Sequence, residues 1–114
     1  MTLVIDGANV VGSVPDGWWR DRAGAARRLV ERLADRECTV VLEGAARTGV
    51  AEGVVGRVTV VHAPGSGDDT LAALAGPGVT VVTADRGLAE RVRAAGGDVV
   101  GPRSLARQRG RDPE

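Results

Sequence analysis

The sequence contains no Phe and no Tyr, and its only large aromatic residues are Trp18 and Trp19. Val, Leu, Ile and Ala must therefore fill the core. A single cysteine, Cys38, excludes an internal disulfide and a cysteine-rich zinc site. Lysine is absent, and all 15 basic residues are arginine, whose planar fork suits phosphate; a GC-rich coding bias would explain the same composition.

Long apolar runs are also missing. No stretch approaches the roughly 18 residues that a membrane span needs, and the start of the chain lacks the basic and apolar regions of a signal peptide. We therefore expect a cytoplasmic protein without membrane contact. The net charge of zero means that no overall field draws the protein toward nucleic acid. The 114 residues predict one domain over 1–109 and a frayed tail over 110–114.

Short apolar runs alternate with amphipathic segments along the chain. The predicted strands are Leu3–Asp6, Thr39–Leu42, Val58–Val61, Val79–Val82 and Val99–Val100. The predicted helices run from after Trp19 to about Asp35, from Asp68 to about Ala75 and from Arg86 to Ala95. Residues 12–17 are expected to form a loop, and a short helix or turn is expected around Val50–Val55. This alternation predicts an α/β fold with a parallel sheet covered on both faces.

Acidic residues follow the predicted strands. Asp6 and Glu43 end the first two, Asp68 and Asp69 open the helix after the third, and Asp85 lies just past the fourth. In a parallel sheet these positions share one edge, where ligands of such sheets bind. Crowded carboxylates raise one another's pKa or require a cation. Oxygen ligands suit Mg²⁺ or Mn²⁺, which can position phosphate and lower the pKa of a bound water. The pattern indicates phosphodiester cleavage.

Each acid also fits a structural role on its own. An Asp at the end of a strand commonly starts a turn or caps the next helix. Glu43 is the least supported member, because it stands alone before a glycine. His62 is a lone histidine at a strand end, and such a residue is more often structural than a ligand. Only the joint arrival of several acids at one edge favours a shared site.

Three ordered blocks resemble the NYN domain, the branch of PIN-like nucleases that includes the YacP-like bacterial ribonucleases. The first, residues 4–10, has an acid followed by Gly-x-Asn. The second, residues 65–71, is a turn of small residues that leads into an acidic helix start. The third, residues 81–88, has Thr-x-Asp leaving a strand. Together the blocks span nearly the whole chain in the order of the family.

The resemblance implies a three-layer sandwich with a parallel five-stranded sheet of order 3-2-1-4-5. It implies an endoribonuclease that depends on Mg²⁺ or Mn²⁺. The catalytic set that it implies is Asp6, Asn9, Asp68, Asp69 and Asp85. The four acids would bind the metal, with Asp69 as an additional ligand, and Asn9 would orient Asp6 or touch the substrate. The sequence departs from the family in having Glu43 where Asp is expected, Gly67 where Ala is common, and no long helix in residues 44–57.

Several residues near these acids are candidates for RNA contact. Trp18 could stack on an unpaired base or cover the core. The other candidates for substrate contact are Arg20, Thr83 and Arg86; further arginines with the same potential are Arg22, Arg47, Arg103, Arg107, Arg109 and Arg111. The expected partner is RNA, either mRNA, tRNA or ribosome-associated RNA, with monomer and homodimer both left open. The alternative is a catalytically silent RNA-binding or protein-interaction module with a PIN-like fold.

Overall fold

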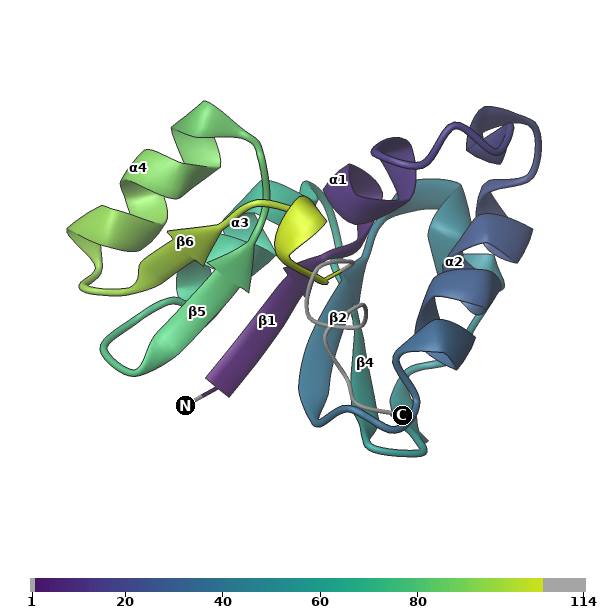
Figure 1. The fold of residues 1–114 in the computed structure, drawn as a ribbon, viewed down its shortest axis with the longest axis horizontal. Helices are drawn as coiled ribbons and strands as arrows, with labels where there is room; N and C mark the ends of the chain where they lie inside the picture. Colours follow the sequence, from purple (N-terminus) through teal and green to yellow (C-terminus); the bar gives the residue numbers. More distant parts are fainter. Residues whose placement is uncertain (1, 106–114) are drawn as a thin grey trace.

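The structure, a computed structural model, describes residues 2–105. Its sheet has six strands in the order β3-β4-β2-β1-β5-β6 (Figure 1). The parallel strands are β1 (Thr2–Asp6), β2 (Cys38–Leu42), β4 (Val58–His62), β5 (Val79–Val82) and β6 (Asp98–Val100). These are the five predicted strands in their predicted spatial order. The predicted α/β architecture is confirmed.

The sixth strand, β3 (Gly53–Val55), corrects the expectation of a helix or turn around Val50–Val55. It pairs antiparallel with β4 at the edge of the sheet, with Val55 opposite Val58. The two residues between them form a tight turn, and Gly56 supplies the required positive φ of 58°. The sheet is therefore mixed at this edge, where the sequence predicted only parallel strands.

Helices cover both faces of the sheet. The first face carries α1 (Gly7–Gly12) and α2 (Arg22–Arg32), and the second carries α3 (Gly67–Leu74) and α4 (Arg86–Ala94) (Figure 1). Alternate residues of one strand enter the two cores: Ile5 packs with α2, and Val4 packs with α3 and α4. The result is the predicted three-layer sandwich.

Two features of the first face differ from the sequence prediction. The six-residue helix α1 occupies a segment for which no helix was expected, and it precedes a 3₁₀ turn, η1 (Trp18–Arg20). Helix α2 ends at Arg32, three residues before the expected end, because the chain turns at Leu33. A second 3₁₀ segment, η2 (Gly44–Thr48), follows β2. Both 3₁₀ turns lie next to the carboxyl edge of the sheet.

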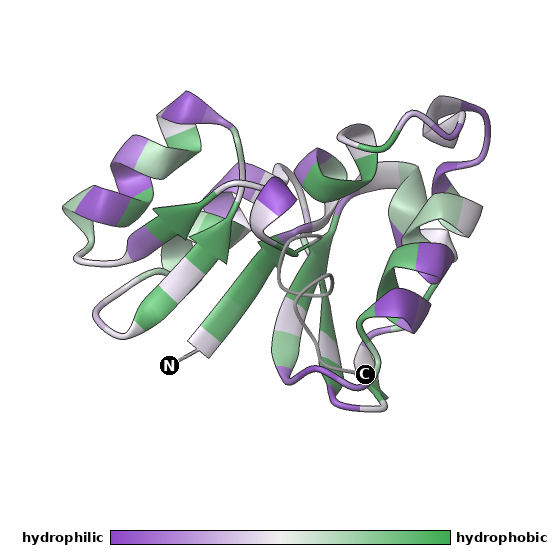
Figure 2. Ribbon diagram, in the orientation of Figure 1, coloured by the Kyte–Doolittle hydropathy of each residue, from purple (hydrophilic) through white to green (hydrophobic). Residues whose placement is uncertain are grey.

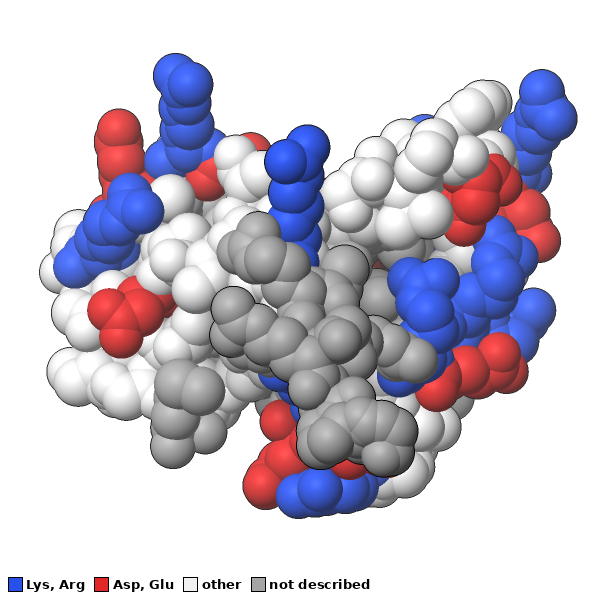
Figure 3. All heavy atoms as spheres, in the orientation of Figure 1, with Lys and Arg blue, Asp and Glu red and all other residues white. Residues whose placement is uncertain are grey.

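The distribution of polarity follows from this layering. The strands are largely apolar, and the polar residues of α2 and α4 form their outer faces (Figure 2). On the face drawn in Figure 3, mainly basic side chains lie over these two helices, with some acidic side chains among and beside them. Within residues 2–105, no helix combines the length and apolar character required to cross a bilayer.

Candidate active site

Asp6 is the last residue of β1 and is buried, with 5% of its surface exposed. Its Oδ2 accepts a hydrogen bond of 2.7 Å from Thr83 Oγ1, and its Oδ1 accepts one of 3.3 Å from the backbone N–H of Asn9. Thr83 follows β5, the neighbour of β1. From β1 the chain crosses to β2 on one side, and from β5 it crosses to β6 on the other side. α/β sheets bind their ligands where two adjacent strands lead away in opposite directions.

The same network continues into the loop after β5. Asn9 Oδ1 accepts a hydrogen bond of 2.8 Å from the N–H of Ala84, so α1 is tied to this loop. Thr83 Oγ1 accepts the N–H of Asp85 at 3.1 Å, and Asp85 Oδ1 caps α4 by accepting the N–H of Leu88 at 2.8 Å. Asn9 and Thr83 therefore fix the positions of both Asp6 and Asp85.

The remaining two predicted acids lie on the first turn of α3. Ser66 caps this helix by accepting the N–H of Asp68 at 3.1 Å. Asp68 is half-buried, whereas the side chain of Asp69 is 75% exposed and forms an ion pair of 3.0 Å with Arg91 of α4. Asp69 thus points toward the guanidinium group of Arg91 on the neighbouring helix.

Two of these carboxylates have raised pKa values. Burial raises the pKa of Asp6 most, the hydrogen bonds from Thr83 and Asn9 lower it, and the charges of Asp68 and Glu43 raise it further. The pKa of Asp68 is raised by burial and by the charge of Asp85, is lowered by Arg91 and is raised again by Asp69. The acids therefore repel one another across the edge, as the sequence pattern predicted.

Glu43 follows β2 and stands where the family pattern has Asp. Its side chain contacts the start of α3. Its Oε1 accepts the N–H of Gly67 at 3.0 Å. A Cβ atom at position 67 would lie only 2.1 Å from this oxygen, so a larger residue cannot fit there while Glu43 keeps its place. The carboxylate of Glu43 fills the space that the methyl group of an alanine at position 67 would need. His62 is turned elsewhere, with Nε2 at 2.7 Å from the carbonyl oxygen of Val50.

In residues 2–105, no group of three or more Asp, Glu, His or Cys side chains is drawn together closely enough to hold a metal ion. The chemistry of the donors nevertheless fits a hard divalent cation, because all are carboxylates, and burial together with their mutual repulsion raises the pKa of Asp6 and Asp68. The residues that such a cation would use thus lie within electrostatic range of one another, but no three of those described are drawn together as a metal-binding group.

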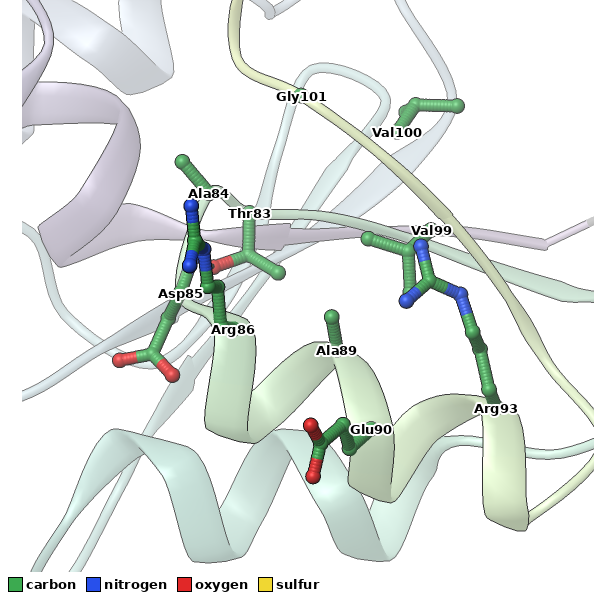
Figure 4. A pocket seen from close by; sticks show the side chains of 10 residues that line it. All are labelled: Thr83, Ala84, Asp85, Arg86, Ala89, Glu90, Arg93, Val99, Val100 and Gly101. Atoms are coloured by element: carbon green, nitrogen blue, oxygen red, sulfur yellow. Dashed lines mark hydrogen bonds between the residues drawn. The ribbon is translucent and has the colours of Figure 1, made fainter.

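The predicted RNA contacts surround this edge on two sides. On the side of α1, Trp18 is half-buried and Arg22 lies 5.5 Å over its ring, while Arg20 lies 5.8 Å over the exposed Trp19. On the side of α4, an open pocket of about 450 Å³ is lined by Thr83, Asp85 and Arg86, among others. Figure 4 shows the side chains that line this pocket.

Figure 4 also shows Arg86 and Arg93 extending on either side of Ala89. Thr83 lines the same pocket but is itself 2% exposed, so its hydroxyl serves the network around Asp6. Of the tail arginines, Arg103 is described and exposed, whereas Arg107, Arg109 and Arg111, like the predicted tail over 110–114, lie outside the described residues.

Sequence reasoning missed two pairings. In the sequence, Glu43 and Gly67 appeared only as two separate departures from the family pattern. The signal that they contact each other was that both departures occur in the same chain. The ion pair between Arg91 and Asp69 left no local signal, because it joins two helices whose packing the sequence does not specify.

Comparisons with known proteins support the fold. No protein-family model matches the chain, and no curated protein sequence matches it significantly. Among solved structures, Rae1 (YacP) from Bacillus subtilis is similar, with a TM-score of 0.71 and 18% identity over 95% of this chain and 72% of that one. A tryptophan-to-leucine variant of the same protein gives a TM-score of 0.73 and 20% identity over 95% and 74%. The YacP-like fold expected from the three motifs is confirmed.

Proposed function

We propose that this protein is a metal-dependent endoribonuclease that hydrolyses RNA phosphodiester bonds. The observation that carries the proposal is the buried Asp6, fixed by Thr83 and Asn9 beside Asp85 and within electrostatic range of Asp68. Burying a carboxylate among other carboxylates is unfavourable for folding, and a role in binding a cation accounts for it. The likeness to Rae1 (YacP) supports the fold on which this arrangement stands.

Asp6, Asp68 and Asp85 are the residues that would hold Mg²⁺ or Mn²⁺, with Asp69 as an additional acid. When bound, such an ion lowers the pKa of a water molecule and stabilises charge on the phosphate oxygens. The chain itself supplies the positions: Thr83 and Asn9 hold the carboxylate of Asp6, and the cap of α4 holds that of Asp85. This rigid side of the site would orient the scissile phosphate.

RNA would approach between the two arginine-bearing sides of the edge. Arg86 would contact phosphate on the side of α4, and Arg20 would do so beside the tryptophans. The zero net charge predicts modest affinity for free RNA, so mRNA or tRNA bound to the ribosome is a suitable substrate. We further propose a cytoplasmic location, and sedimentation will distinguish a monomer from a homodimer.

The test is cleavage of a labelled RNA in Mg²⁺ or Mn²⁺ by the wild type and by Asp6→Asn and Asp85→Asn. We expect cleavage that requires the metal and is lost in both variants. The exposed Asp98, an acid at the opposite edge of the sheet, provides a matched control, and Asp98→Asn should cleave as the wild type does. Equal cleavage by wild type and Asp6→Asn would refute the metal site.

A catalytically silent RNA-binding module is the second candidate. It is favoured by two observations: no three of the described acids are drawn together closely enough to hold a metal ion, and Asp69 is paired with Arg91. Calorimetric titration with Mn²⁺ separates the two functions. Binding of Mn²⁺ by the wild type, weakened in Asp6→Asn, supports the nuclease, whereas binding of RNA without uptake of Mn²⁺ or cleavage supports the module.

A further inference from the structure

A recess of about 220 Å³ lies beside the acids, on the side of α1. Its walls come from α1, from η1, from the start of α2 and from the segment after β2, and they include Gly7, Val11, Trp18, Arg22 and Glu43. Gly7 directly follows Asp6 in the chain, so a group bound in this recess would be adjacent to the proposed catalytic edge.

The recess combines the indole side chain of Trp18 with charged groups of both signs. The indole of Trp18 lies against the end of α1, where a Cβ atom added at Gly12 would be 3.7 Å from Cζ2 of the indole. The guanidinium of Arg22 lies 5.5 Å over the same ring. Aromatic and guanidinium planes of this kind stack on unpaired bases, and the charge of Arg22 attracts the phosphate of the same nucleotide.

Glu43 adds a fixed hydrogen-bond acceptor. The N–H of Gly67 holds its Oε1 at 3.0 Å, and the absence of a Cβ at position 67 leaves room for this arrangement. An ionised carboxylate only accepts hydrogen bonds. Guanine places an imino and an amino donor side by side on its Watson–Crick edge, whereas uracil has one donor between two carbonyl groups that would face the carboxylate.

We propose that this recess binds one unpaired base of the RNA and that Glu43 gives it a preference for guanine. This proposal rests on the proposed cleavage of RNA at the neighbouring acids. It adds the identity of one nucleotide of that RNA. Cleavage would then occur near an unpaired guanine.

The test uses the full chain with Trp19→Phe, which leaves Trp18 as the only indole. Its single indole N–H resonance, and the backbone amide of Gly44 in the same recess, are followed by NMR during titration with GMP or UMP. We expect both signals to shift, with GMP binding about fivefold or more tightly than UMP. Absence of a shift with either nucleotide overturns the subsite, and equal affinity overturns the role of Glu43.

The matched variant is Glu43→Gln, which keeps an acceptor for Gly67 but replaces the second oxygen by a donor. We expect it to bind both nucleotides and to lose the preference for GMP; an unchanged preference overturns the role of Glu43. Because binding is measured without cleavage, an inactive protein that still binds GMP refutes the nuclease but not the subsite. Active protein without nucleotide shifts refutes the subsite alone.

Discussion

The acids at the carboxyl edge are held in two different ways. On the side of β1 and β5, Asp6 and Asp85 belong to a continuous hydrogen-bond network through Thr83, and Asn9 ties α1 to the same loop. On the side of α3, Asp68 and Asp69 receive no such support: Asp69 is exposed and paired with Arg91, and Asp68 is half-buried at a helix start.

Under the proposed function, this difference predicts different roles for the two sides of the site. Hydrogen-bonded carboxylates keep one geometry, as preorganised catalysis requires. Acids at a helix start can adjust their side chains when a cation arrives. Substitutions on the network side should therefore have larger effects on activity than those on the α3 side, and those that remove its hydrogen bonds should also have larger effects on stability; the following predictions test that ranking.

The largest effect is expected for Asp6→Asn, with opposite signs for activity and stability. RNA cleavage should fall by at least about 100-fold, because the central carboxylate is lost. The melting temperature in metal-free buffer should stay equal or rise. The folded state binds the proton of Asp6 more tightly than the unfolded state does, because the pKa is raised, so ionised Asp6 opposes folding.

The same reasoning fixes the pH dependence. Through Asp6, stability is greatest in acid, declines as the pH rises from the ordinary to the raised pKa, and is constant above it. Asp6→Asn should remove this decline in a series of thermal melts. A variant that is less stable than the wild type at neutral pH would show that the carboxylate has a structural function.

Asp85 allows its cap and its charge to be separated. Asp85→Asn retains a side-chain oxygen for the N–H of Leu88, so it should keep the wild-type stability and lose activity. Asp85→Ala should lose activity and, in addition, about 1 kcal/mol of stability through loss of the cap. Chemical denaturation and cleavage assays measure the two effects, and equal stability of the two variants would contradict the assigned cap.

Thr83→Val should have an intermediate effect. It removes the donor to Asp6 and the acceptor for the N–H of Asp85, so we expect a loss of about 1–3 kcal/mol of stability. Activity should fall by about 10- to 100-fold, the usual effect of losing a group that orients a metal ligand. Thr83→Ser keeps the hydroxyl and serves as the control; a serine variant as impaired as the valine variant would assign the effect to packing.

The smallest effect is expected for Asp69→Asn. Its ion pair with Arg91 is exposed, so stability should change by less than about 1 kcal/mol in urea denaturation. Cleavage should change less than in any variant of the network side. If Asp69→Asn impairs cleavage as strongly as Asp6→Asn does, the proposed division between the two sides is wrong.

The fold could be predicted largely from local patterns. Apolar runs ending in Asp6 and Val82 marked buried parallel strands, and the alternation with helical segments placed their carboxyl ends together. The strand β3 was not predictable in this way, because Gly53–Val55 is exposed and gains its structure only by pairing with β4. Helix α1 was missed because it is short and both begins and ends at a glycine, a poor helix former.

By itself, the sequence determined which acids share the carboxyl edge, because parallel strands all end at the same edge of a sheet. The tertiary structure decided which groups touch. Thr83 reaches Asp6 across 77 positions of sequence, and the contact of Glu43 with Gly67 spans 24. Such contacts depend on strand register and helix placement, which arise from packing over the whole domain, and no local pattern encodes them.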